Sequence, residues 1–150
     1  MSTVSQKCQY ALRAVFELAK RYDQGPAKIS EIADVQAIPI RFLEVILNQL
    51  KQGGFTDSRR GKEGGYTLIK APRELTVGDI IRFVEGPLGP VECVNAKPMD
   101  RCPLRGDCVF LPLWERVKEA VSEIYDSTTF QDLVEEERKR SEHYVPQYTI

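Results

Sequence analysis

Three of the four cysteines in this 150-residue chain lie within seventeen residues, in the segment ECVNAKPMDRCPLRGDC. Cys93 and Cys102 have eight residues between them, and Cys102 and Cys108 have five. The segment shows neither helical nor strand periodicity, and two prolines and a glycine interrupt it. Such a loop needs something other than a hydrophobic core to fix it, and thiolates are the usual ligands of iron–sulfur clusters.

Other states of these thiols are less favoured. Structural zinc generally uses close pairs of cysteines, which this segment lacks, and the only histidine, His143, lies near the C-terminus. A disulfide would leave one of the three thiols unpaired and is unusual in a reducing compartment. Unligated structural cysteines are the remaining alternative, although the prolines and the glycine make this loop a poor place to bury them.

The charges around the thiols favour a negatively charged ligand. Lys97, Arg101 and Arg105 lie in the same loop. Cys108 precedes a helix that is expected to begin near Leu111, so the positive end of that helix would face the thiol. We therefore predict an iron–sulfur cluster, [2Fe–2S] or [4Fe–4S], on the three loop cysteines.

The elements that must position this loop begin with three predicted helices. Apolar residues recur at three and four positions over 10–22, Gly25-Pro26 ends that helix, and Ser30 opens a short second one. Pro39 is suited to the first turn of a third helix, which runs to about residue 52 and ends at a glycine pair. The third helix is expected to bury Phe42, Leu43, Ile46, Leu47 and Leu50.

Beyond the third helix the hydrophobic period changes from 3.6 to 2. Residues 55–58 and 65–69 are predicted as two strands around the polar turn 59–64. Three helices followed by a two-stranded hairpin are typical of a winged helix-turn-helix. The predicted fold class is therefore mainly α with a small β wing, and a generic α+β domain is the alternative.

Further helices are predicted on both sides of the cysteine loop. Thr76 would cap a fourth helix that ends at residue 85, and Thr128 would cap a last helix over 130–138. Between them, residues 111–125 carry a long apolar stripe, wider than one domain of about 70 residues needs. We interpret the stripe as a dimerisation helix that packs against its twin, and coverage of its own domain's core is the alternative. The stripe consists of Leu113, Trp114, Val117, Ala120, Val121, Ile124 and Tyr125.

The chain is divided accordingly into four parts. Residues 1–85 form the winged helix-turn-helix domain with its following helix, and residues 86–110 form the cysteine-rich loop. Residues 111–138 form the dimerisation helix and a short C-terminal helix. Residues 139–150 are polar and are expected to be a flexible tail.

The third helix carries the first candidate contacts to DNA. In a winged helix-turn-helix this helix enters the major groove. With the apolar positions turned inward, Ile40, Arg41, Glu44 and Val45 are free to face outward. Arg41 can bind a guanine edge or a phosphate, and Glu44 can accept a hydrogen bond from a cytosine amino group. A solvated ion pair between Glu44 and Arg41 is the alternative.

The wing carries a second set of candidate contacts. Arg59, Arg60 and Lys62 lie on its glycine-rich turn, and cations on a thin hairpin suit a narrow minor groove. Residues 1–70 have 11 basic and 7 acidic side chains (+4), and residues 71–150 have 10 and 15 (−5). The basic half is therefore expected to meet a polyanion, with ordinary surface charge as the alternative.

Nothing in the pattern indicates a membrane or export. No apolar run approaches the roughly 20 residues that span a bilayer, and the first residues lack the apolar core of an export signal. Four cysteines in such a chain are more often thiols or metal ligands than disulfides. We expect a cytoplasmic protein with no membrane partner.

Several stretches together resemble the Rrf-type bacterial winged-helix regulators, the family of IscR, NsrR and CymR. The matching stretches are YALRAV at 10–15, residues 38–50, GKEGGYTL at 61–68, and LTVGDII with VEG between 75 and 86. The resemblance covers roughly residues 1–137. It implies a homodimeric transcription factor with a long crossing helix. In the cluster-binding branch it also implies an iron–sulfur centre on three loop cysteines, here Cys93, Cys102 and Cys108.

The chain departs from the family pattern at the fourth ligand. IscR-type proteins have a histidine three residues after the last cysteine, where this chain has Leu111, and they space the first two cysteines more tightly. NsrR-type proteins recruit a carboxylate from the partner's first helix, where this chain has Gln9. Cys8 is adjacent, but neighbouring helical residues point about 100° apart. The fourth ligand is therefore open between Cys8, Gln9 and an outside molecule.

The sequence thus predicts a homodimeric DNA-binding regulator, acting as a repressor on a two-fold symmetric operator, whose affinity is set by the cluster. A cluster-free regulator of the same fold, similar to CymR and controlled by a protein partner or metabolite, is the alternative. A thiol or electron-transfer enzyme is a distant alternative, because no histidine or acid motif pairs with a cysteine and no nucleotide-binding glycine pattern is present. The protein is not expected to be an enzyme.

Overall fold

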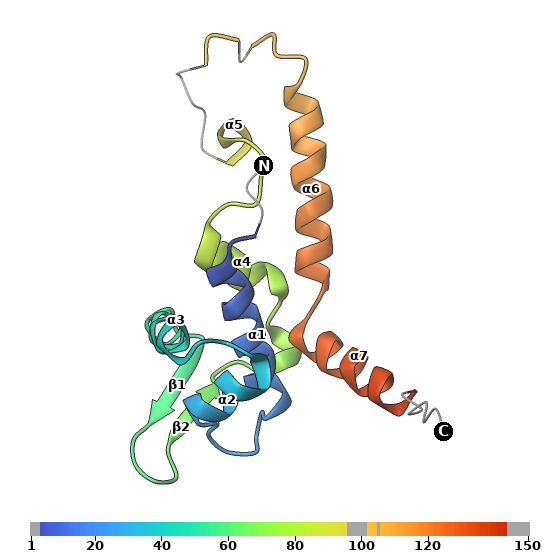
Figure 1. Cartoon of the computed structure of the whole chain (residues 1–150). Helices are drawn as coiled ribbons and strands as arrows, with labels where there is room; N and C mark the ends of the chain where they lie inside the picture. The colour runs from blue at the N-terminus through green and yellow to red at the C-terminus, as the bar shows by residue number, and fades with distance from the viewer. Residues whose placement is uncertain (1–3, 96–101, 105, 144–150) are drawn as a thin grey trace, which may run out of the picture.

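The computed structural model describes residues 4–95, 102–104 and 106–143. Its N-terminal part contains the three predicted helices and the wing (Figure 1). The two strands pair antiparallel, with Thr56 opposite Leu68 and Arg59 opposite Gly65. The predicted fold class, mainly α with a small β wing, is confirmed. The elements of this part are α1 (Gln6–Lys20), α2 (Ile29–Gln36), α3 (Ile40–Gln52), β1 (Thr56–Arg59) and β2 (Gly65–Leu68).

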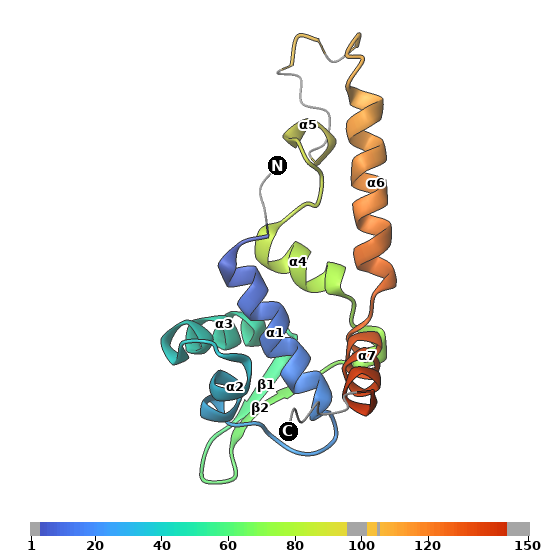
Figure 2. The same cartoon turned by 45° about the vertical axis from the view of Figure 1, so that its right-hand side comes forward.

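The second part of the chain extends away from the N-terminal part, here called the head, and its last helix packs back against the head. A 3₁₀ turn, η1 (Pro72–Glu74), leads to α4 (Val77–Glu85), the short α5 (Glu92–Asn95), α6 (Leu111–Ser127) and α7 (Phe130–Glu142). In both views α6 extends away from the head, with the cysteine segment at its far end, and α7 returns beside α1 (Figure 1 and Figure 2). Among the helices that the structure describes, none combines the length and apolar composition of a membrane span.

One hydrophobic core is formed by the helices α1, α2, α3 and α4, together with β2 and the start of α7. Phe130, the first residue of α7, is fully enclosed in this core. The backbone N–H of Phe130 also donates to the Leu75 carbonyl, 3.0 Å away, which ties α7 to the segment before α4. The last helix is therefore part of the head rather than an appendage. The largest fully buried side chains of the core are those of Val15, Ile32, Leu43, Leu47, Leu50, Leu75, Ile80 and Phe130.

Two helix starts follow the same capping chemistry. The Thr76 hydroxyl accepts from the Asp79 N–H, and the Asp79 carboxylate accepts from the Thr76 N–H, so the predicted cap of α4 is confirmed. For α7 the cap is Thr129, which exchanges the same two bonds with Asp132. The expected cap, Thr128, is wrong, because its hydroxyl donates back to the Ile124 carbonyl at the end of α6.

The last helix is longer than the sequence pattern indicates. It continues to Glu142 and so includes four residues that were expected to belong to the tail. An ion pair between Arg140 and Glu136, one turn apart, supports this extension, with 3.0 Å between Nε and Oε1. The remainder of the expected tail, residues 144–150, lies outside the described residues.

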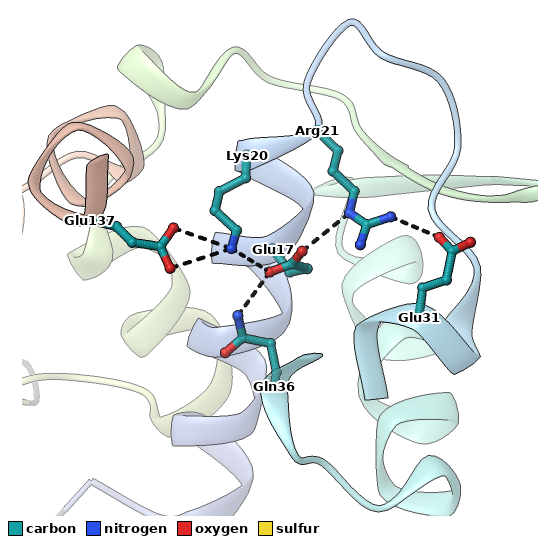
Figure 3. A network of polar contacts seen from close by, with 6 residues as sticks. All are labelled: Glu17, Lys20, Arg21, Glu31, Gln36 and Glu137. Atoms are coloured by element: carbon teal, nitrogen blue, oxygen red, sulfur yellow. Dashed lines mark hydrogen bonds and ion pairs between the residues drawn. The ribbon is translucent and has the colours of Figure 1, made fainter. Parts of the chain in front are cut away.

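A buried carboxylate joins α1, α2 and α7 (Figure 3). Glu17 accepts a hydrogen bond from Gln36 Nε2 on α2 at 2.9 Å. It also pairs with Lys20 Nζ on its own helix at 3.0 Å and with Arg21 Nε just beyond that helix at 3.2 Å. Lys20 continues to Glu137 on α7, where the Nζ–Oε2 distance is 3.2 Å. One charged group thus connects the helix-turn-helix to the C-terminal helix.

The charge state of Glu17 follows from these partners. Burial alone would raise the pKa of the carboxyl group, because it removes water from the charged form. Hydrogen bonds from Gln36, Lys20 and Arg21, together with the charge of Lys20, outweigh that effect and hold the pKa below its ordinary value. Glu17 is therefore ionised at neutral pH, and its buried charge is compensated.

Candidate nucleic-acid interface and cysteine segment

The helix α3 has one face in the core and the opposite face in solvent. Its core face is formed by residues at positions i, i+3, i+4 and i+7, which is the spacing of one helical stripe. Arg41 and Glu44, the two predicted base-reading residues, are exposed on the other side, as are Ile40 and Val45. The buried residues are Leu43, Ile46, Leu47 and Leu50.

The expectation that Phe42 is buried is wrong. Its side chain is 61% exposed at the flank of α3, and its ring centroid lies 6.3 Å from that of Tyr10 on α1. Adjacent helical residues point about 100° apart, so the orientation that buries Leu43 carries Phe42 to the edge of the core.

The wing presents the three predicted cations to solvent. Arg59 ends β1, Arg60 and Lys62 lie in the turn, and all three side chains are exposed. Between them, Gly61 has a φ of 103°, a backbone conformation that favours glycine and lets the turn reverse tightly. The wing is thus a narrow hairpin with its positive charges at and near the tip.

Contacts that the sequence pattern does not indicate fix the wing relative to α3. Lys51 Nζ, in the last turn of α3, donates to Ser58 Oγ on β1 at 2.6 Å. At the base of the wing, Ala27 and Tyr66 exchange two backbone hydrogen bonds of 2.9 and 2.8 Å. The wing is thus joined to α3 at Ser58 and to the segment before α2 at Tyr66. A polar Ser58 inside a short strand was the only sequence signal for the first contact.

The three loop cysteines lie on separate parts of the segment. Cys93 lies in α5, Cys102 lies in the loop, and Cys108 lies just before α6; Cys102 is exposed and the others are partly exposed. Over residues 4–95, 102–104 and 106–143, no three Cys, His, Asp or Glu side chains stand close enough to hold a metal ion. The donor set suits an iron–sulfur cluster, since three thiols share one segment. Their gathering at one centre is not seen in this conformation.

The basic residues expected to balance a cluster charge, Lys97, Arg101 and Arg105, lie outside the described residues. The part of the segment that is described contains a helical turn, α5, that the sequence pattern does not indicate. Asn95 closes this turn by exchanging two hydrogen bonds with the Gly89 backbone, at 2.7 and 3.0 Å. Lys118 Nζ on α6 donates to the Val94 carbonyl at 2.5 Å. Contacts that use no thiol therefore hold the Cys93 turn against α6.

The two candidates for a fourth ligand differ in accessibility. Cys8 faces the core of the head and is fully buried. Burial, reinforced by the negative charge of Glu85, raises the pKa of the Cys8 thiol to about 11. Gln9 is exposed, and its Nε2 donates to the Val4 carbonyl at 3.0 Å. A ligand role for Cys8 would require the thiol to leave the core and lose a proton, whereas Gln9 already faces solvent.

The apolar stripe of α6 divides into two rows. Trp114, Val121 and Tyr125 are partly covered, and the last two line a small cavity, together with Val117, against α4 and the segment after it. The second row, Leu113, Val117, Ala120 and Ile124, repeats at spacings of four, three and four. Ile124 in this row is 63% exposed, and α6 contains no buried residue. The second row is therefore uncovered by its own chain at Leu113, Ala120 and Ile124 and partly covered at Val117.

The base of α6 is attached to the head through a two-bond ion pair. Arg82 Nη1 and Nη2 on α4 donate to the two carboxylate oxygens of Asp126 at 2.6 and 2.7 Å. The hydrogen bond from Arg82 lowers the pKa of Asp126. The Val77 N–H also donates to the Thr128 carbonyl at 2.9 Å, just beyond α6. These contacts fix the direction in which α6 leaves the head.

Known proteins are similar to this chain in both sequence and architecture. Residues 4–136 match the family described as "Rrf2: Iron-dependent Transcriptional regulator". The chain is 38% identical to the HTH-type transcriptional regulator CymR of Bacillus subtilis over 130 residues, which span 87% of this chain and 88% of CymR.

Two solved structures extend the comparison. The structure of CymR (YrzC), the global cysteine regulator of B. subtilis, gives a TM-score of 0.73 at 37% identity, with 90% of this chain and 98% of that chain covered. IscR of T. potens gives a TM-score of 0.74 at 31% identity, with 98% and 95% covered. The helix α3 and the wing agree with the family match. The chain belongs to the Rrf2 family of winged-helix transcriptional regulators, which are not enzymes.

Proposed function

We propose that this protein is a homodimeric, cytoplasmic repressor whose operator affinity is set by an iron–sulfur cluster on Cys93, Cys102 and Cys108. The observation that carries the proposal is the connection between two functional surfaces: the reading head and the three-thiol segment are joined by one long helix, α6. The family description, an iron-dependent regulator, supports the cluster.

The head would bind DNA through both of its exposed sets of polar residues. Arg41 and Glu44 on α3 would face base edges in the major groove, where arginine recognises guanine and glutamate recognises cytosine. Arg59, Arg60 and Lys62 would enter the adjacent minor groove. Lys51 joins α3 to the wing, so the two sets of contacts would lie on adjacent elements of one head.

The uncovered row on α6 supports a two-fold symmetric dimer. Leu113, Val117, Ala120 and Ile124 alternate at spacings of four and three, which is the seam pattern of paired helices. A second copy would bury this row and place two heads in a fixed relation. Two related heads would then read a two-fold symmetric operator.

The thiols would hold the cluster, with Gln9 of the partner or an outside molecule as the fourth ligand. When bound, the cluster supplies a constraint among three points of the segment that depends on iron and oxidation state. The chain's own contacts would carry a change in the segment towards the head. Lys118 joins the Cys93 turn to α6, and Arg82 joins α6 to α4.

A cluster-free regulator is the second candidate, and two observations favour it. The 38% identity to B. subtilis CymR covers most of both chains. The described thiols are not gathered at one centre. In this case a protein partner or metabolite would control the dimer, and the loop cysteines could be replaced without loss of regulation.

Anaerobic reconstitution with iron and sulfide separates the two candidates. Absorption spectra, Mössbauer spectra and iron content would be compared for the wild type, Cys102→Ala and the control Cys8→Ala. The proposal predicts a coloured, iron-loaded wild type and Cys8→Ala control, and an iron-poor Cys102→Ala. A colourless, iron-free wild type would overturn the cluster and leave the cluster-free regulator. Loss of iron in a folded Cys8→Ala would instead identify Cys8 as a ligand.

Salt-dependent binding tests the DNA contacts separately. Arg60→Ala should weaken binding about equally on all sequences and reduce the slope of log affinity against log salt by about 2, because each subunit of the dimer loses one phosphate contact. Arg140→Ala on α7 removes the same charge away from the reading surface and should leave the slope unchanged. An unchanged slope in Arg60→Ala would exclude a phosphate contact of Arg60.

A further inference from the structure

The exposed face of α3 is partly apolar, which the proposed contacts of Arg41 and Glu44 do not explain. Ile40 is 47% exposed and Val45 is 55% exposed. Elsewhere on this 13-residue helix the apolar residues are buried, apart from Phe42 at its flank. Two β-branched apolar side chains on the solvent face of a reading helix indicate a ligand with apolar features of its own.

The positions of these residues interleave with the polar ones. Residues four apart on a helix lie next to each other on the same face. Ile40 therefore lies beside Glu44, and Arg41 lies beside Val45. Whatever base pair Arg41 reaches, Val45 would face the edge of a pair next to it. The face thus alternates polar and apolar contacts along one groove.

The charges around the apolar pair identify its partner. Arg41 stands beside Val45, and the exposed Arg59 and Arg60 lie on the wing that Lys51 holds against α3. Three arginines on α3 and the adjoining wing outnumber Glu44 on this face and complement DNA rather than an apolar protein surface. In the major groove the distinctive apolar group is the C5-methyl of thymine.

We propose that Val45, assisted by Ile40, reads thymine methyl groups and makes the operator specific for A·T pairs beside the pair read by Arg41. The inference rests on the proposed DNA-binding function and adds a specificity-determining contact to it. Burial of one methyl group changes affinity about fourfold. Two equivalent half-sites would therefore give about a fifteenfold preference.

Replacement of thymine by deoxyuridine tests this contact, because it removes the methyl group and keeps every base-pair hydrogen bond. The full-length dimer, cluster-loaded and cluster-free, would first select its preferred sequence from random DNA. Each thymine of that operator would then be replaced in turn. We expect one or two positions per half-site at which deoxyuridine weakens binding about fourfold.

Variants locate the side chain responsible. Val45→Ala should weaken binding to the thymine operator and abolish the difference between thymine and deoxyuridine at its position. Ile40→Ala should do the same at a second position. Val35→Ala is a matched control, because Val35 is 56% exposed but lies on α2. It should keep the full difference.

The outcomes separate the two proposals. Sequence-selective, salt-sensitive binding that is indifferent to deoxyuridine would overturn the methyl contact and leave the proposed function standing. A deoxyuridine effect that persists in both Val45→Ala and Ile40→Ala would also overturn it. If neither form of the wild type selects any DNA sequence, both the proposed function and this inference fail.

Discussion

The head and the arm of this protein are stabilised in different ways. The head, residues 4–85 with α7, encloses one continuous core in which large apolar side chains are fully buried. The arm, residues 86–127, contains no buried residue in either of its helices, α5 and α6. The ion pair between Arg82 and Asp126 joins the arm to the head, whereas the bonds of Lys118 and Asn95 lie within the arm.

This difference assigns separate tasks to the two regions. A closed core fixes the relation between α3 and the wing, so the shape that meets DNA is set by the head alone. In the proposed function, an arm without a core would take its final arrangement from a second copy along α6 and from a ligand at the thiols. Control of DNA binding should therefore act on the relation between two heads rather than on the shape of either one.

The largest expected effect is on the core residue that closes the head. Phe130→Ala should lower the free energy of unfolding by about 3–5 kcal/mol, because it opens a cavity where α7 meets the core. Urea denaturation measures the change, with the exposed Ile69→Ala as a control that should shift it by less than about 0.5 kcal/mol. A loss below about 1 kcal/mol would show that α7 is not part of the head.

A substitution in the arm should change dimerisation rather than the stability of the fold. Ile124→Glu places a charge in the uncovered row of α6 and should weaken dimerisation about a hundredfold while the head stays folded. Sedimentation velocity gives the mass, and circular dichroism reports the fold. Glu115→Gln alters the charge of α6 away from this row and should leave the dimer intact. A dimer unaffected by Ile124→Glu would exclude the row from the interface.

The buried carboxylate of the head should give a pH-dependent contribution. Glu17→Gln should cost about 1–3 kcal/mol at neutral pH, because it leaves the charges of Lys20 and Arg21 without their buried partner. The folded state lowers the pKa of Glu17, so this stabilisation is complete above the ordinary glutamate pKa and is lost as the pH falls through the lowered value.

The difference in free energy of unfolding between the wild type and Glu17→Gln should accordingly shrink as the pH falls. Urea denaturation at a series of pH values measures this difference. Glu31→Gln changes an exposed residue of the same network. Its difference in free energy of unfolding from the wild type should be smaller and should depend less on pH. A gap for Glu17→Gln that is independent of pH would contradict the assigned charge.

The smallest expected effect is at the junction of head and arm. Arg82 and Asp126 are both partly exposed, so a double-mutant cycle with Arg82→Ala and Asp126→Ala should give a coupling of about 1 kcal/mol or less in unfolding. A coupling above about 2 kcal/mol would mean that the junction is built like the head's core.

Sequence patterns predicted the head well, because its signals are local and repeated. The core stripe of α3, the Thr76 cap and the change of period at the wing each involve residues close in the chain. Even the misassigned cap had a local signal, since Thr129 stands three residues before Asp132 in the capping pattern.

The predictions that differ from the structure concern contacts between segments that are distant in the sequence. The exposure of Phe42 depends on how α1 crosses α3, and α5 depends on hydrogen bonds to Gly89 and Lys118. The Glu17 network links residues up to 120 positions apart, from Glu17 to Glu137. No periodicity within one element contains such information. The predicted ligand role of the three thiols stays a prediction, since no periodicity of the loop indicates whether they converge.

The dependence of DNA binding on the thiol segment can be measured directly. Operator affinity would be determined at one fixed salt concentration for the reconstituted and the cluster-free wild-type dimers, with Cys102→Ala carried through both treatments. We predict that the two wild-type forms differ by about fivefold or more and that the two Cys102→Ala preparations do not. Equal affinities for an iron-loaded and an iron-free wild type would contradict control by the cluster.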